Sequence, residues 1–247
     1  MTTCDTSTVV GWLVDGARSA PQQHQILLEL CDRLIECGVP LWRVGVFVRT
    51  LHPHVMGRRF LWQPDIGVSV TEAEFARVDE EDYQTSPVVY LYGTGRALRR
   101  RLANADCPND FPILDVLRGV GITDYLVSPP LFLNGEIHVA TWATRLPGGF
   151  TDAQIAGIEA VVAPLARVAE IHALRRTASN LLDAYVGHLA GERILGGRIH
   201  RGDTEAIHAV IWLSDMRGFT ALADERMPNP RRRPECYGST LRIPTAL

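Results

Sequence analysis

The chain has 247 residues, of which 46% are hydrophobic and 21% charged, the composition of an ordinary globular protein. A formal net charge of −3 gives no electrostatic basis for binding nucleic acid or an anionic membrane surface. All the basic residues are arginine, so no lysine is present to form a Schiff base.

The cysteines and the N-terminal residues help to predict the cellular compartment of the protein. The five cysteines are odd in number and show neither metal-site nor disulfide spacing, which favours reduced thiols. The first residues lack the basic and apolar regions of a signal peptide, and no apolar run is long enough for a membrane span. We therefore expect a cytoplasmic protein.

The first part of the chain predicts a helix followed by a hairpin. Residues 1–20 are small and polar, and we expect an N-terminal lead-in there. In residues 22–40, apolar side chains recur at three- and four-residue steps, which predicts an amphipathic helix that ends at Gly38. Residues 41–51 alternate like a strand, and residues 58–64 predict a second strand paired with it.

The middle of the chain has a mixed pattern. Residues 71–86 are acidic and are expected to be helical or irregular. Residues 88–95, VVYLYGTG, predict a short strand. Residues 96–104, RALRRRLAN, predict a short basic helix or loop, whose charged face is expected to be solvated rather than an anion site. Residues 111–121 predict a helix that ends at a glycine.

A second hairpin and a long helix follow. Residues 122–145 predict two strands joined by an Asn-Gly turn. The next residues predict a long helix with Thr151 or Asp152 as its N-cap and a bend at Pro164. Helix, hairpin, mixed middle, hairpin and helix together predict the α+β class, with an antiparallel sheet and flanking helices.

Residues 177–203 predict a helical linker with two readings. Its apolar side chains could pack on their own domain, or they could form a parallel helix pair with a second copy. Both readings stay open for the set Leu181, Leu182, Tyr185 and Leu189.

Residues 21–176 resemble a GAF-type sensor domain. The resemblance lies in the element order and in the closing segment LNGEIHVATWATRLPGGFTDAQIAGIEAVVAPLA. It implies a small-molecule ligand that the sequence does not name. We expect Cys31 in the core, His138 as an ordinary strand residue, and the main aromatic side chains in the sheet core, although some could line a ligand cavity: Trp42, Phe47, Trp62, Tyr90, Tyr92 and Trp142.

Residues 204–226 carry a more specific pattern, an apolar strand followed by Asp215, two residues, Gly-Phe-Thr and a helix start. An aspartate at a strand end suits Mg²⁺, and the amides of Gly218, Phe219 and Thr220 at a helix start suit a triphosphate. The segment resembles the beginning of the catalytic domain of soluble bacterial class III adenylate/guanylate cyclases, which has a ferredoxin-like fold.

That resemblance implies a metal site and a reaction. Asp215 and the backbone carbonyl of Met216 would contact Mg²⁺ or Mn²⁺, and ATP or GTP would be cyclised with release of pyrophosphate. The second metal-binding aspartate of that family does not follow, because residues 227–247 form a tail rich in proline and arginine.

The leading hypothesis is therefore a truncated cyclase in cyclic-nucleotide signalling, without measurable activity from this chain alone. The alternative is a stand-alone GAF-like sensor or dimerisation module that regulates a full-length cyclase by pairing with it. The expected protein partner is a second copy of the chain or a full-length cyclase. A frameshift near Arg226 is a third reading of the tail.

Overall fold

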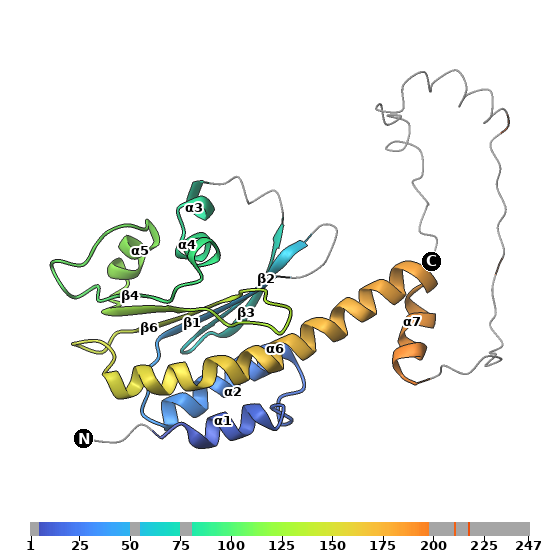
Figure 1. Cartoon of the computed structure of the whole chain (residues 1–247), viewed down its shortest axis with the longest axis horizontal. Helices are drawn as coiled ribbons and strands as arrows, with labels where there is room; N and C mark the ends of the chain where they lie inside the picture. Colours follow the sequence, from blue (N-terminus) through green and yellow to red (C-terminus); the bar gives the residue numbers. More distant parts are fainter. Residues whose placement is uncertain (1–4, 50–54, 75–80, 198–209, 211–216, 218–247) are drawn as a thin grey trace. The chain divides into compact units, whose positions relative to one another are not determined.

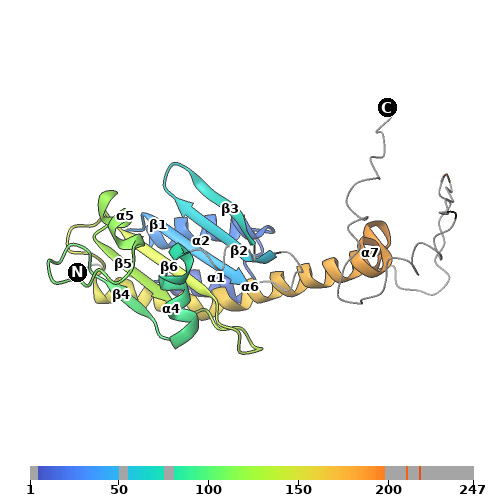
Figure 2. The same cartoon turned by 90° about the horizontal axis from the view of Figure 1, so that it is seen from above.

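The computed structural model describes residues 5–49, 55–74 and 81–197, together with Val210 and Arg217. Residues 1–199 form one compact unit, built on a six-stranded antiparallel sheet with the strand order β3-β2-β1-β6-β5-β4 (Figure 2). The expected α+β class is confirmed. The strands are β1 (Arg43–Arg49), β2 (Val55–Gln63), β3 (Gly67–Glu74), β4 (Leu98–Arg100), β5 (Asp124–Ser128) and β6 (Val139–Thr144).

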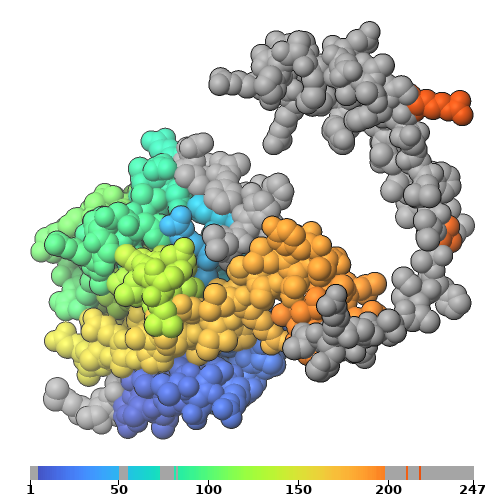
Figure 3. Space-filling model, turned by 45° about the vertical axis from the view of Figure 1, so that its right-hand side comes forward, coloured from blue at the N-terminus to red at the C-terminus, as the bar shows by residue number. Residues whose placement is uncertain are grey.

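Helices cover both faces of the sheet. The helices α1, α2 and α6 lie on one face, and the shorter α3, α4 and α5 lie on the other (Figure 1). In the space-filling view, α1 and α2 form a layer against α6 (Figure 3). The helices are α1 (Ser7–Val14), α2 (Gln23–Glu36), α3 (Glu81–Gln84), α4 (Pro87–Thr94), α5 (Ile113–Gly119), α6 (Asp152–Val186) and α7 (His188–Leu195).

The alternation of side chains along the strands creates two separate cores. On β1, Val44, Val46 and Val48 pack against the layer of α1, α2 and α6, while Phe47 packs on the opposite side with α4 and α5. Because successive residues of a strand point to opposite faces, one strand supplies both cores. The sheet is therefore covered on both sides and can hold a cavity beneath the smaller helices.

The expected N-terminal lead-in is wrong for part of residues 1–20. Residues Ser7–Val14 form α1, and its Val9 and Leu13 side chains are buried in the first core. The helix is only two turns long, so its periodicity is weak in the sequence. Tertiary burial against α2 and α6 stabilises it rather than intrinsic helix propensity.

Residues 88–95 form a helix, α4, and not the expected strand. The Ser86 hydroxyl accepts a hydrogen bond from the Val89 N–H at 3.4 Å, Pro87 occupies the first turn, and Gly95 ends the helix with φ +66°. These are ordinary N-cap and C-cap signals, and they outweigh the β-propensity of the valines and tyrosines between them.

Two further expectations for the middle of the chain are corrected. Residues 67–74 form β3, a third strand after the first hairpin, where the sequence suggested helix or loop from residue 71. Residues 98–100 form β4, an edge strand paired with β5, in place of a basic helix or loop.

The long helix α6 confirms its expected start and extends beyond its expected end. Thr151 is the N-cap, and it forms a capping box with Gln154. Pro164 lies inside the helix, which continues to Val186. The predicted linker at 177–203 therefore begins within α6 and continues through α7. None of the described helices is long and apolar enough to cross a membrane.

Candidate ligand-binding cavity

A cavity of about 420 Å³ lies between the sheet and the helices α3, α4 and α5. Its volume is within the range of small-molecule pockets. The sheet contributes Arg43, Phe47 and Arg49 from β1, Arg59 and Leu61 from β2, Thr71 from β3, Tyr125 from β5 and Thr141 from β6. The helices contribute Tyr83, Val88, Tyr92, Ile113 and Leu117.

The strand register explains why these side chains meet. Phe47 on β1 is opposite Arg59 on β2, and Gly45 lies between Leu61 and Thr141 on the neighbouring strands. A Cβ atom at Gly45 would lie 2.7 Å from the Thr141 hydroxyl and 3.2 Å from the Phe47 ring. Glycine is therefore the residue that lets these two side chains occupy the cavity floor.

Tyrosines and arginines give the cavity its polar character. The Arg49 guanidinium carbon lies 5.3 Å from the centroid of the Tyr92 ring, within the range of a cation–π contact. Burial raises the pKa of Tyr92, and burial raises the pKa of Tyr125 to about 12, with Arg43 nearby opposing the shift. Both phenols are therefore neutral hydrogen-bonding groups at physiological pH.

Arg43 is half-buried beside Tyr125. Burial lowers the pKa of Arg43, and the like charge of Arg59 acts in the same direction, whereas Tyr125 opposes it. Among the described residues that line the cavity, Glu72 is the one acid. Glu72 is already engaged by Arg58 at 2.9 Å and by Arg176 of α6 at 3.4 Å.

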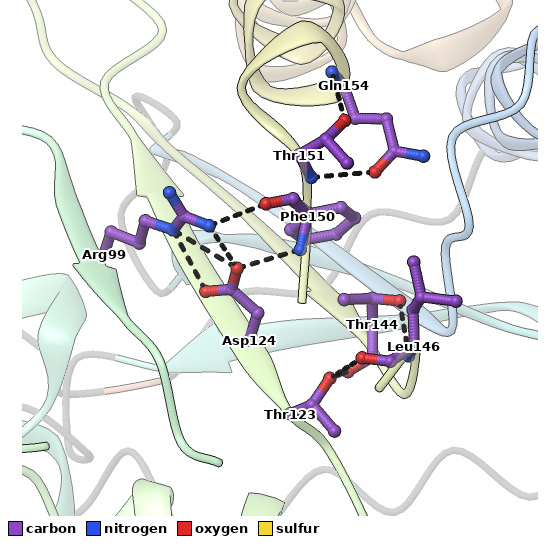
Figure 4. A network of polar contacts seen from close by, with 8 residues as sticks. All are labelled: Arg99, Thr123, Asp124, Thr144, Leu146, Phe150, Thr151 and Gln154. Atoms are coloured by element: carbon purple, nitrogen blue, oxygen red, sulfur yellow. Dashed lines mark hydrogen bonds and ion pairs between the residues drawn. The ribbon is translucent and has the colours of Figure 1, made fainter. Parts of the chain in front are cut away.

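A buried polar network connects β5 to the start of α6 (Figure 4). Asp124, which is fully buried, receives hydrogen bonds from the Arg99 guanidinium at 2.6 Å and from the Phe150 N–H at 3.0 Å. Arg99 also donates to the Phe150 carbonyl at 2.8 Å. Because Tyr125 follows Asp124 on β5, the cavity floor and the N-terminus of α6 are attached to one strand.

His138 connects the end of β1 to the loop before β6. Its Nδ1 accepts the Arg49 N–H at 3.1 Å, and its ring lies 3.7 Å, centroid to centroid, from Phe132. Burial lowers the pKa of His138 to about 4. Leu133, which follows Phe132 in the same loop, donates its N–H at 2.9 Å to the carboxylate of Glu170 in α6.

The residues expected to bind metal and phosphate lie outside the described residues: Asp215, Met216, Gly218, Phe219 and Thr220. Within the part of the chain that is described, no cluster of three or more histidine, cysteine, aspartate or glutamate side chains could hold a metal ion. His52 and His54, which flank a proline and were expected to form a surface loop rather than a metal site, also fall outside the described residues.

The aromatic side chains divide between the two expected roles. Trp62 and Trp142 are buried in the first core, and Tyr90 is partly exposed. Phe47 and Tyr92 line the cavity, and Cys31 is buried as expected.

The basic segment 96–104 differs from its expected solvated helix face. Its Arg99 binds the buried Asp124, and its Arg100 pairs with Asp110. Arg43, Arg59 and Tyr125 of the cavity were not singled out by the sequence. The signal that could have found the two arginines is that they share a strand face with large apolar residues, Arg43 with Phe47 on β1 and Arg59 with Leu61 on β2.

Solved structures show which fold this is; no protein-family model and no curated protein matches the chain. The GAF domain of a phosphoenolpyruvate-protein phosphotransferase from Coxiella burnetii is similar, with a TM-score of 0.51 and 14% identity over 72% of this chain and 99% of that one. The domain therefore has the GAF fold, and the comparisons support no cyclase domain.

Two further similar structures are more distant. The GAF domain of a two-component sensor histidine kinase from Bacillus halodurans has a TM-score of 0.45 and 15% identity, over 62% of this chain and 97% of that one. The phycocyanobilin-bound GAF domain from a cyanobacterial phytochrome has a TM-score of 0.46 and 13% identity, over 69% of this chain and 97% of that one.

Proposed function

We propose that this chain is a sensor module that binds a small molecule in the cavity above β1 and β2 and transmits its occupancy to α6. The observation that carries the proposal is the cavity itself, with its combination of apolar walls and a few convergent polar groups. The GAF fold of the domain supports it, and a phycocyanobilin-bound GAF domain is among the similar structures.

Two contacts could transmit occupancy to α6. Tyr125 lines the cavity, and the adjacent Asp124 holds the first turn of α6 through the Phe150 N–H. On the other side, Arg49 lines the cavity, and its backbone N–H binds His138 in the loop that is hydrogen-bonded to Glu170. A ligand that moves either strand end therefore acts on α6 through buried or partly buried hydrogen bonds.

The test is a thermal-shift screen of small molecules against the wild type and a Leu61→Trp variant, whose larger side chain fills the cavity. A ligand at a hundred times its Kd stabilises the folded protein by about 2.7 kcal/mol. We expect compounds that raise the melting temperature of the wild type but not of Leu61→Trp, and that change hydrogen exchange in α6. The proposal fails if Leu61→Trp, still folded, responds to every compound as the wild type does.

A cyclase output is a finer proposal that rests on the sequence alone. We infer from residues 204–226 that the signal serves class III nucleotide cyclisation, in which Asp215 and the Met216 carbonyl would bind Mg²⁺ or Mn²⁺ for ATP or GTP. The alternative, regulation of a separate cyclase by this module, needs no catalysis by the chain. A cyclic AMP assay of the purified chain, with Asp215→Asn as its control, separates the two.

A further inference from the structure

The cavity carries an excess of positive charge. Arg43, Arg49 and Arg59 line it, and the one acid among the described lining residues, Glu72, is shared between Arg58 and Arg176. The neighbouring phenols of Tyr92 and Tyr125 do not offset this charge, because burial keeps both neutral. The cavity therefore has a positive potential.

Arg43 lines the cavity from β1. It is half-buried, and no carboxylate of the described residues forms an ion pair with it. Burial and the like charge of Arg59 both lower the pKa of Arg43 and so disfavour its charge. A guanidinium removed from water without a counterion is costly, and an anion at this place removes that cost.

Arg59, on β2, lines the same cavity as Arg43. Its Nε donates to the Thr71 hydroxyl at 3.0 Å, which fixes the orientation of the guanidinium plane. Planar guanidinium groups bind carboxylates and phosphates through paired N–H donors. Arg43 on β1 and Arg59 on β2 therefore both offer guanidinium donors to an anion in the cavity.

The remaining walls require an apolar ligand body. Phe47 and Leu61 lie beside the arginines, and Ile113 and Leu117 of α5 are in the second core that borders the cavity. An inorganic anion would contact the arginines and leave these surfaces unfilled. The volume of about 420 Å³ accommodates a ring system that bears a charged group.

We propose that the ligand of this cavity is a small organic anion, a carboxylate or phosphate ester on an apolar ring, with its charged group bound by Arg43 and Arg59. The proposal rests on the proposed function, since it assigns the chemical class of the molecule sensed at the same site.

The test compares three probes of equal shape and different charge. Calorimetric titration measures the binding of 2-naphthoate, neutral 2-naphthamide and the cation of 2-naphthylmethylamine to the wild type, Arg43→Gln and Arg59→Gln. Arg33→Gln is the matched control, because it removes the same charge from α2, where Arg33 pairs with Glu29. Circular dichroism establishes that each variant is folded.

We expect naphthoate to bind the wild type and the Arg33→Gln control more tightly than the amide does, and the cation not to bind. Each cavity variant should weaken naphthoate binding about 10- to 100-fold, the size of a lost charge-assisted hydrogen bond, and leave the amide unchanged.

Equal affinity for naphthoate and naphthamide, unaffected by Arg43→Gln, would overturn the charge assignment while the ligand-binding function stands. Binding of none of the probes would also overturn it, because a preformed site retains some affinity for its own class. The proposed function is then decided separately by the Leu61→Trp screen.

Discussion

Asp124 shows how one buried residue organises three elements. Its carboxylate, on β5, binds Arg99 of β4 and the Phe150 N–H just before α6 (Figure 4). Gly149, with φ +77°, is close to it, since a Cβ there would lie 2.5 Å from Asp124 Oδ2. These residues are far apart in the sequence, and no local pattern indicates that they are in contact.

We predict that Asp124→Asn destabilises the protein by about 3 kcal/mol, because it leaves the partly buried Arg99 without its counterion. The free energy of unfolding in urea measures this loss. The matched control is Asp110→Asn, which removes the partner of the next residue, Arg100, at a more exposed position. Its loss should stay below about 1 kcal/mol. Equal losses in the two variants would show that burial of Asp124 adds nothing.

We predict that the buried His138 makes the free energy of unfolding depend on pH. Its pKa is about 4 in the folded protein, below the ordinary value of 6.5, because burial disfavours the charged ring. As the pH falls below 6.5, the unfolded chain binds a proton at this residue before the folded one does, so the folded state loses stability down to about pH 4. Glu136 and Glu170 oppose this shift, and Arg49 strengthens it.

Between pH 7 and pH 5, we expect the wild type to lose about 2 kcal/mol more than His138→Asn does, since asparagine keeps a hydrogen-bond acceptor but does not titrate. Urea unfolding at several pH values measures the difference. Parallel pH profiles for the two proteins would refute a neutral buried His138.

At the scale of elements, the sequence predicted the strongly patterned segments. The helix at 23–36, the hairpin of β1 and β2 and the hairpin of β5 and β6 all have clear periodicity, and the structure confirms them. A half-buried strand or an amphipathic helix is specified by its own hydrophobic spacing.

The segments that were mispredicted are short or lie at sheet edges. The strand β3 begins at Gly67, has the alternating Val68 and Val70, and follows a turn that contains Asp65 with positive φ. The valine alternation after an Asp-Ile-Gly segment was the sequence signal for this strand. The strand β4 has three residues, and pairing with β5 decides its conformation rather than its own propensity. In α4, the caps decided between helix and strand.

At the scale of the whole molecule, the outer face of α6 carries exposed apolar side chains that could pair with a second copy of the chain. Ile171, Leu174, Leu181 and Tyr185 are 62%, 63%, 54% and 86% exposed. With the alanine at position 178, they follow alternating three- and four-residue steps, on the face roughly opposite to the buried Leu165. Leu182 packs near Gly191 of α7 instead. Of the two readings of the linker, this exposure favours pairing with a second copy.

We predict that the chain forms a dimer through this outer face of α6. Light scattering after gel filtration measures the molar mass. A variant that combines Leu174→Glu and Leu181→Glu should be monomeric, because it places charges in the apolar interface. Its melting temperature should stay close to that of the wild type, which shows that the monomer is folded. Val116→Glu, at another exposed apolar side chain, is the control and should remain dimeric. A wild type that is monomeric at all concentrations would contradict the prediction.

The sequence by itself determined the fold class, the two main hairpins, the capped long helix and the resemblance to a GAF domain, because each depends on local spacing or on the order of elements. Only the tertiary structure decided the candidate site. Arg43, Arg59 and Tyr125 come from three strands, and each alone resembles an ordinary strand residue. Sheet register and the packing of α4 and α5 place them around one cavity, and no local pattern specifies that long-range pairing.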